Sequence, residues 1–559
     1  MKRLCFLSVL FLQTLPWLAA QQTLGLFLND SLAFNGYTLL VPPNYPVTYL
    51  IDNCGNVVHT WTSDYDPGLS AYLLENGNLL RTARIPSNFP GGGTGGRMEL
   101  FDWDGNLLWG YNYSSVAYHQ HHDVMPMPNG HILLIAWEDH SEQEAIDAGR
   151  QPGSMPASGL WSEQVVELEP VGTNGAIIVW QWRLWDHLVQ DFDAAKLNFG
   201  NVSEHPELAN INFTGAPDGL PGPKDWIHLN SVDYNAELDQ VLVSSRAWSE
   251  VWVIDHSTST QEAAGHTGGT QGKGGDLLFR WGNPQVYGRG TSADQQFFGQ
   301  HSAHWIAQGL PDAGRIMVFN NGLGRPDGDY SSVDIIAPPV ATNGSYPISA
   351  GQPFAPAAAA WTYTADPPTL FLAGNTSGAQ RQPNGNTLVC DGPRGRIFEI
   401  TQDGELVWDY ISPVFASGPA TQGQNASGSS LFRAQRYAPD YAGLAGKDLT
   451  PSGPIELNPL PANCELFVQG PNAAVAQPSP LASVRMAPNP AGGHFYIENK
   501  NRHKLNVTVS DLTGRIVCQL EADAPVIFCE TDGWGKGLYV VQITDSATGS
   551  SIIQKMIKL

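Results

Sequence analysis

Along most of the chain, apolar and polar residues alternate in short runs, and each run ends at a tight-turn signal. Alternation with a period of two indicates strands that bury one face, and residues 37–470 show almost no helical periodicity. The pattern therefore predicts an all-β fold. One phrase, a turn followed by an alternating strand and an aromatic residue, recurs as DNCGNVVHTW (52–61), DWDGNLLWGY (102–111), NGAIIVWQW (174–182), GGDLLFRWGN (274–283) and TQDGELVWDY (401–410).

A second phrase, which reads strand, tight turn, strand, precedes these copies, as in HHDVMPMPNGHILLI (121–135) and TSGAQRQPNGNTLVC (376–390). Its Asn-Gly pairs supply the positive φ that a two-residue hairpin turn needs. The two phrases together give four strands per unit, and repeated four-stranded sheets are typical of a β-propeller. We predict six blades, with seven as the alternative. The sixth blade would join residues 37–61 to residues near 455–470, which leaves no open sheet edge.

The first strands of these hairpins carry histidines at one repeat position. His121, His228 and His301 align there, and counting back from the turn asparagine puts Thr376 at the same place. Since the first strand of each blade lines the central channel, these residues are expected to form a ring around it. The hairpin after His228 returns to Arg246 at the same end of the sheet. Imidazoles and a guanidinium in one well would form a site for an anion.

Two other interpretations of these histidines stay open. His121, His122 and Asp123 are plausible ligands for a metal ion, and a single histidine in such a strand is often structural. An arginine in the same well disfavours a cation, and no acidic residue aligns with the ring on other blades, so we expect neither a metal nor a cofactor. His304, three residues after His301, is expected to point away from the channel because strand side chains alternate. The tryptophans are expected to serve mostly as core.

Charge narrows the function classes. The chain has 53 acidic and 29 basic residues, a formal charge of −24 and an isoelectric point near 4.9. This balance argues against a sequence-independent nucleic-acid-binding protein, and a content of 15% charged residues excludes a disordered chain or a coiled coil. An anionic substrate would need a locally basic pocket, such as the predicted ring.

The first residues, MKRLCFLSVLFLQTLPWLAAQQ, have a basic start, an apolar stretch and small residues at Ala19 and Ala20. They are typical of a signal peptide cut after Ala20, and no later segment is apolar enough to span a bilayer. Export permits disulfides, although the spacing of the five cysteines that remain defines no framework. Cys518 and Cys529 flank one turn and could bridge a hairpin.

The composition changes after about residue 471, where PNAAVAQPSPLAS has the make-up of a linker. The rest of the chain reads as alternating strands of a small β-sandwich. The predicted domains are a signal peptide (1–20), a propeller (21–470), a linker (471–485) and the C-terminal sandwich (486–559).

The segments HHDVMPMPNGHILLIAWE, DWIHLNSVDYNAELDQVLVSSRAWSEVWVID and QHSAHW followed by IMVFNNGLGR resemble the PAPS-independent arylsulfate sulfotransferases, which are six-bladed propellers. The resemblance covers roughly residues 37–470. It implies ping-pong transfer of a sulfuryl group from an aryl sulfate to a phenol through a sulfohistidine, without a nucleotide donor. The separate N-terminal β-sandwich of that family is missing here, which puts a dimer built through it in doubt.

The resemblance also implies roles for individual residues. His301, within Gln-His-Ser-Ala, would be the nucleophile, and His228, Asn230 and Arg246 match the pattern that holds the sulfate. The remaining channel positions correspond to His121, which is expected to be catalytic, and to Thr376, which with Asn230 is expected to bind substrate.

The tail contains PNP, VSDLTGRIV, GKGLYVVQI and a basic terminal KMIKL, and it resembles the C-terminal sorting domain of type IX secretion. This implies passage through the periplasm, export by the type IX machinery, and a final place in the medium or on the cell surface. A cell-wall or carbohydrate-binding module is the alternative interpretation of the tail.

The sequence thus favours an aryl sulfotransferase that acts on small aryl sulfates and phenols, with no nucleic acid as a partner. Two alternatives remain. One is a non-catalytic propeller displayed for binding, lectin-like or adhesive, and the other is a metal-dependent hydrolase.

Overall fold

The computed structural model describes residues 22–215, 224–461, 464–467, 484–487, 491, 493–499, 502–511, 515–546 and 551–558. The chain forms two compact units, residues 1–469 and 470–559. The predicted signal peptide and most of the predicted linker lie outside the described residues. Within the described residues, no helix combines the length and the apolar character that crossing a membrane requires.

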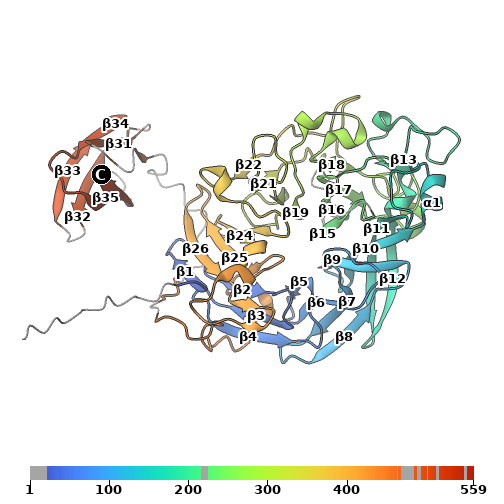
Figure 1. Cartoon of the computed structure of the whole chain (residues 1–559), viewed down its shortest axis with the longest axis horizontal. Helices are drawn as coiled ribbons and strands as arrows, with labels where there is room; N and C mark the ends of the chain where they lie inside the picture. Colours follow the sequence, from blue (N-terminus) through green and yellow to red (C-terminus); the bar gives the residue numbers. More distant parts are fainter. Residues whose placement is uncertain are drawn as a thin grey trace, which may run out of the picture. The chain divides into compact units, whose positions relative to one another are not determined.

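The first unit consists of six antiparallel sheets of the propeller type, arranged radially as Figure 1 shows. The first sheet contains β5 (Pro67–Leu73), β6 (Leu79–Arg84), β7 (Gly96–Phe101) and β8 (Leu107–Asn112). The second contains β9 (Tyr118–Pro126), β10 (Ile132–His140), β11 (Leu160–Val171) and β12 (Gly175–Arg183). The third contains β15 (Leu229–Asn235), β16 (Gln240–Ser245), β17 (Glu250–Asp255) and β18 (Phe279–Trp281). The fourth contains β19 (His301–Trp305), β20 (Ile316–Asn320), β21 (Ser332–Ile336) and β22 (Trp361–Tyr363). The predicted all-β fold with six blades is confirmed.

The last two sheets use both ends of the first unit. The fifth contains β23 (Gly378–Arg381), β24 (Thr387–Asp391), β25 (Arg396–Ile400) and β26 (Leu406–Ile411), and β1 (Gly25–Asn29) adds to its outer edge. The sixth combines β29 (Gln435–Tyr437) with β2 (Tyr37–Leu40), β3 (Val47–Ile51) and β4 (Val57–Thr62).

The ring closes where β29 pairs with β2, so that Tyr437 lies opposite Tyr37. The prediction that residues near 455–470 supply the closing strand was wrong. The described residues of that segment make isolated bridges, such as Leu457 to Thr421, and form no strand. The reason is that the closing strand must be the innermost of its sheet, and the chain has already passed the channel by residue 437.

The tryptophans of the repeated phrase join each blade to the next. One tryptophan of each copy lies on the fourth strand of its blade, and its indole N–H donates to a backbone carbonyl of the next blade, as buried indoles usually find an acceptor. The prediction that most tryptophans serve as core is confirmed for these residues, which are at most 5% exposed. The pairs are Trp61 to Asp102, Trp109 to Gly175, Trp182 to Gly275, Trp281 to Pro356 and Trp408 to Asn53, at 2.6–2.9 Å.

The inner strands depart from regular alternation where they approach the channel. The backbone is left-handed at His122, His228 and Ser302, with φ of 51°, 52° and 56°. A non-glycine residue in this region costs on the order of 1–2 kcal/mol, and such positions cluster at functional sites. His121 and His301 precede a left-handed residue whereas His228 is itself one, so the three predicted histidines do not share one backbone position.

Short helices and minor strands occupy the connections. The helices α1 (Glu142–Asp147) and α2 (Thr260–Ala263) both begin with a capping box, formed by Ser141 with Glu144 and by Ser259 with Glu262. The remaining elements are β13 (Leu188–Val189) paired with β14 (Ala209–Asn210), β27 (Val414–Phe415) paired with β28 (Gly418–Pro419), and the 3-10 turns η1 (Leu184–Asp186), η2 (Val202–Glu204), η3 (Pro284–Tyr287), η4 (Ser292–Asp294), η5 (Pro368–Leu370), η6 (Gly392–Arg394), η7 (Ala426–Gly428) and η8 (Ala442–Leu444).

The second unit contains two sheets around one apolar core that includes Phe495, Val507 and Val541. One sheet consists of β30 (Arg485–Ala487), β31 (His494–Glu498) and β34 (Val526–Glu530), and the other of β32 (Leu505–Asp511), β33 (Ile516–Ala522), β35 (Gly537–Asp545) and β36 (Ser551–Lys558). This is the small β-sandwich that the sequence predicts.

The disulfide of the described residues joins Cys54 to Cys464. Cys518 and Cys529 are thiols, so the suggested bridge between them is wrong in this structure. They belong to β33 and β34, which lie in different sheets. A bridge between them would link the two layers of the sandwich rather than a hairpin.

Candidate active site

Four ionisable side chains meet near one end of the inner strands. His122 lies in β9, His228 directly before β15, Arg246 directly after β16, and His301 at the start of β19. Each is at most 5% exposed. The ring centroids of His122 and His228 are 4.6 Å apart, and the backbone N–H of Arg246 donates to the carbonyl of His228 over 3.1 Å. Together with His121, we call these residues the histidine cluster.

His301 is held in one tautomer. Its Nδ1 lies 2.7 Å from Oδ1 of Asn321, while Nδ2 of Asn321 donates to the carbonyls of Ala373 and Thr376 at 2.6 and 3.1 Å. Oδ1 must therefore accept, so the proton of His301 is at Nδ1 and the lone pair at Nε2. Burial, followed by the nearby charge of Arg246, lowers the pKa of His301 to about 3. The neutral ring presents a nucleophilic nitrogen.

His228 pairs with a carboxylate. Its Nδ1 lies 2.6 Å from Oδ2 of Asp225, and the indole N–H of Trp137 donates to Oδ1 of Asp225 over 3.1 Å. The carboxylate fixes the proton at Nδ1 and stabilises the imidazolium that forms when Nε2 accepts a second proton. This arrangement suits His228 to move protons at Nε2.

His121 contacts His122 and lies farther from His228, with ring centroids 6.5 Å apart. It is fully buried, and its ring stacks on Trp137 with centroids 4.1 Å apart. Its Nε2 lies 2.9 Å from Oε2 of Glu163, and its Nδ1 lies 2.8 Å from Nδ1 of His122. Burial favours the neutral forms of this set: it raises the pKa of Glu163 and lowers the pKa values of both imidazoles.

These partners define a line of donors. With Glu163 protonated, its carboxyl donates to Nε2 of His121, because Oε1 of Glu163 already accepts the backbone N–H of Leu229 over 2.8 Å. Nδ1 of His121 then donates to Nδ1 of His122, which places the proton of His122 at Nε2. His122 is thus set to donate a hydrogen bond, and His121 positions it.

Asn230 and Thr376 both support His301. Asn230 is fully buried, and its Nδ2 donates to the carbonyl of Gln300 over 2.7 Å, which fixes the residue before His301. Thr376 is half-buried, and its carbonyl accepts from Asn321 over 3.1 Å. The structure brings both residues to the cluster through the elements that hold the nucleophilic ring.

Sequence reasoning missed most of the supporting groups. Asp225 lies in the DWIH segment and Asn321 in FNNG, so both were within quoted motifs, but no repeat position singles them out. Glu163 and Phe432 carry no sequence signal. Phe432 lies 5.9 Å from His122 and 6.4 Å from His301 between ring centroids, and it supplies an apolar wall.

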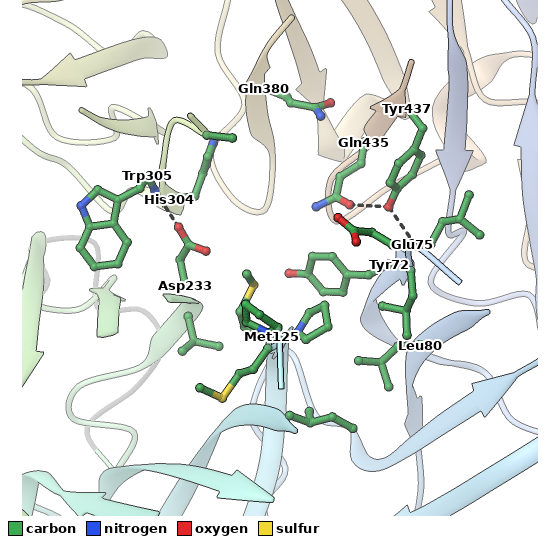
Figure 2. Close-up of a pocket in the computed structure, with 18 of the residues that line it drawn as sticks. Tyr72, Glu75, Leu80, Met125, Asp233, His304, Trp305, Gln380, Gln435 and Tyr437 are labelled. Atoms are coloured by element: carbon green, nitrogen blue, oxygen red, sulfur yellow. Dashed lines mark hydrogen bonds between the residues drawn. The ribbon is translucent and has the colours of Figure 1, made fainter. Parts of the chain in front are cut away.

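Past the opposite end of the inner strands lies a cavity of about 800 Å³, which Figure 2 shows and which we call the distal cavity. Its lining includes Tyr72, Met125, Asp233 and His304. The prediction that His304 points away from the channel was wrong. In β19, His301 lies opposite Phe319 and His304 opposite Met317, so an extra residue interrupts the alternation and returns His304 to the channel side.

A buried ion pair lies between the histidine cluster and the distal cavity. Arg433 follows Phe432 and forms an ion pair with Asp123, which follows His122. The hydroxyl of Tyr72 donates to Oδ1 of Asp123 over 2.8 Å. Burial acts to lower the pKa of Arg433, but the charge of Asp123 outweighs it and raises this pKa. Asp123 is therefore committed to Arg433, and nothing in its contacts favours the metal interpretation.

The fold and the histidine cluster define a β-propeller with buried imidazoles and an arginine at one end of its inner strands. Residues 24–346, more than half of the chain, match the family model of the arylsulfotransferase (ASST), and the protein belongs to this family. Residues 485–559 match the secretion system C-terminal sorting domain. A search among curated proteins found no match.

Solved structures show only distant likeness. A protein of unknown function from Bacteroides caccae matches with a TM-score of 0.36 and 10% identity over 72% of this chain and 99% of its own. AztD from Citrobacter koseri gives 0.33 and 9% over 73% and 99%, and virginiamycin B lyase from Staphylococcus aureus gives 0.31 and 9% over 70% and 88%. These likenesses carry no argument about function.

Membership in the family supports aryl sulfotransferase activity in general. The sorting domain indicates export through the type IX system to the medium or the cell surface.

Proposed function

We propose that the protein transfers a sulfuryl group from an aryl sulfate to a phenol in two steps through His301. The observation that carries the proposal is the hydrogen bond from His301 Nδ1 to Asn321, which leaves the lone pair on Nε2 of a neutral ring. A neutral imidazole with a fixed tautomer is a competent nucleophile.

In the first step, Nε2 of His301 attacks sulfur and the bond from sulfur to the aryl oxygen breaks. The departing phenolate takes the proton from Nε2 of His228, whose imidazolium Asp225 has stabilised. Sulfuryl transfer resembles phosphoryl transfer, in which charge accumulates on the equatorial oxygens. Arg246 and Nε2–H of His122 are the donors proposed for those oxygens.

In the second step, an acceptor phenol gives its proton to Nε2 of His228. The phenol oxygen attacks sulfur, the bond from sulfur to Nε2 of His301 breaks, and the ring returns to its neutral state. Atoms and charges balance over the cycle, because the proton that His228 gives to the first phenol is replaced by the second. The groups named suffice for transfer without a nucleotide donor.

The test uses 4-nitrophenyl sulfate as donor, with and without phenol. Release of nitrophenolate that depends on phenol supports transfer, release without phenol indicates a sulfatase, and no release indicates a binding protein. A quench with donor alone, followed by mass spectrometry, should find one SO₃ group on the peptide that contains His301.

His301→Ala should lower kcat on the order of 10³-fold or more and abolish the adduct. His304→Ala is the matched control, since His304 lies on the same strand and lines the distal cavity. An adduct on His122 or His228, or full activity in His301→Ala, contradicts the proposal.

The domain limits are part of the same proposal: residues 21–470 carry the chemistry and residues 486–559 carry the export signal, beyond a linker at 471–485. A chain that ends at residue 470 should turn over substrate after purification but stay within the cell envelope. Normal export of that chain, or loss of its activity, would contradict these limits.

A further inference from the structure

Outside the channel, three side chains that commonly bind metals lie together. His187 follows η1 and precedes β13, whereas His266 and Asp276 belong to the glycine-rich loop between α2 and β18. One ligand atom from each of the three lies within 4.8 Å of the others. His187 and Asp276 are buried, and His266 is exposed. We call this set the loop cluster.

The contacts of His187 fix the position of its ring hydrogen. Its Nε2 lies 2.8 Å from the carbonyl oxygen of Ala263, which can only accept, so Nε2 carries the hydrogen. Its Nδ1 lies 2.9 Å from Oδ1 of Asp276. In a neutral ring that nitrogen holds a lone pair, and it faces a carboxylate oxygen that also has only lone pairs. Either a hydrogen or a metal cation must lie between the two atoms.

His266 meets the same oxygen from the solvent side. Its Nδ1 lies 2.7 Å from Oδ1 of Asp276, and its ring stands at 90° to that of His187 with centroids 5.7 Å apart. Two imidazole nitrogens and one carboxylate oxygen therefore converge from three directions. This donor set suits zinc and related divalent cations, and it leaves a fourth position for water.

The surroundings hold the buried ligands as metal-bound histidines are usually held. A backbone carbonyl on the other ring nitrogen, here that of Ala263, orients a ligating imidazole and raises its basicity. Trp182 donates its indole N–H to Gly275 over 2.7 Å, and its ring lies parallel to that of His187. Gly275 fits because a Cβ there would lie 2.0 Å from the oxygen of Ala263.

We propose that the loop cluster binds one zinc-class divalent cation, which joins the glycine-rich loop to the segment that carries His187. The present distances are those of hydrogen bonds, and a tetrahedral zinc needs its ligand atoms to separate to about 3.2–3.4 Å. The exposed side chain of His266 can move to open its own contact with Asp276, and the contact between His187 and Asp276 must lengthen by about 0.4 Å from its 2.9 Å. The site shares no residue with the histidine cluster, so it stabilises the fold and takes no part in the chemistry.

The test begins with full-length protein stripped by a chelator and titrated with Zn²⁺ by calorimetry, and with Co²⁺ followed by visible absorption. Native protein should bind one cation, show the absorption bands of tetrahedral Co²⁺, and unfold at a higher temperature with Zn²⁺. His266→Asn should lose all three effects and retain turnover of 4-nitrophenyl sulfate, because an exposed side chain can be changed without unfolding the propeller.

The control is His205→Asn. His205 is a half-buried histidine that also contacts a carboxylate, with Nδ1 2.9 Å from Glu207, but it does not belong to the loop cluster. The His205→Asn variant should bind the cation as the native protein does. Cation binding that survives in His266→Asn places the site elsewhere, for example at the histidine cluster, and overturns the proposal. Absence of binding by native protein overturns it as well.

Discussion

The two ends of the channel are lined by the same inner strands, yet their charges are arranged in opposite ways. At the histidine cluster, Asp225 and Asn321 bond to Nδ1 of their imidazoles and thereby direct Nε2 chemistry away from the protein. At the distal cavity, Asp123 bonds directly to Arg433 and neutralises it within the protein. A carboxylate that bonds to Nδ1 of an imidazole leaves Nε2 free to react, whereas a carboxylate that forms an ion pair with a guanidinium leaves that cation unable to bind a substrate anion.

The largest expected effect comes from removing the carboxylate behind His228. Asp225→Asn should lower kcat about 10²–10⁴-fold, because the amide no longer stabilises the imidazolium and no longer fixes the proton at Nδ1. Asp233→Asn, the same change at the distal cavity, is the control and should leave kcat nearly unchanged. Initial rates with 4-nitrophenyl sulfate and phenol measure both. If Asp225→Asn keeps more than a tenth of the native kcat, the comparison between the two ends fails.

The ion pair at the distal end should matter for stability. Arg433→Met leaves Asp123 buried without its partner, which should lower the free energy of unfolding by about 3–5 kcal/mol. Combining Arg433→Met with Asp123→Leu should recover most of this loss. Denaturant titration gives the values. Lys196→Met serves as control, since Lys196 pairs over 2.8 Å with the exposed carboxylate of Asp147 and its loss should cost far less.

The arginine at the histidine end should act on turnover. Arg246→Ala should reduce kcat/KM by about 10²–10³-fold, or about 2.7–4 kcal/mol, as loss of a preorganised donor to transition-state oxygens does. Arg246→Lys should recover only part, because an ammonium keeps the charge and loses the planar fork. Steady-state kinetics decide the matter. Equal activity of Arg246→Ala and the native protein would show that Arg246, like Arg433, does not act on the substrate.

The smallest effect concerns pH. Burial raises the pKa of Asp233 to about 7 against the N–H donors of Trp305 and Tyr234, which lower it. The folded state therefore holds this proton more tightly than the unfolded state, so the stability it contributes is full below the unfolded pKa and is lost as pH rises through the folded pKa. As the pH rises from about 5 to about 8, the unfolding free energy of Asp233→Asn should increase by about 1–2 kcal/mol relative to that of the native protein. This figure is discounted for solvent screening because the side chain opens to the cavity.

Unfolding titrations of both proteins at several pH values measure this gain. A difference in unfolding free energy that stays constant with pH would show that Asp233 does not titrate in this window.

The fold was largely predictable because its repeat is local. The turn, strand and tryptophan of each phrase are adjacent in sequence, and the contact that the tryptophan makes, as in Trp408 to Asn53, lies one blade away. The closing strand could not be placed in the same way. Its three residues, Gln435–Tyr437, are too few to show a period.

The histidine cluster was predictable only in part. His228, Arg246 and His301 follow from strand and hairpin geometry, and the structure brings them together. The exchange of roles between His121 and His122 was not predictable, because left-handed backbone at His122 reverses which side chain faces the channel. Asp225 and Asn321 reach their histidines through particular side-chain hydrogen bonds, which a repeat pattern does not encode.

The disulfide between Cys54 and Cys464 closes a covalent loop whose ends are 410 residues apart in sequence. In the chain-entropy account, a loop of this size is worth on the order of 5–6 kcal/mol, and it encloses the strands from β4 to β29, whereas β1, β2 and β3 precede Cys54. Cys464 lies ahead of residue 485, where the sorting domain begins. A cut between them detaches the export signal and leaves the loop intact, so the released enzyme keeps its topology outside the cell.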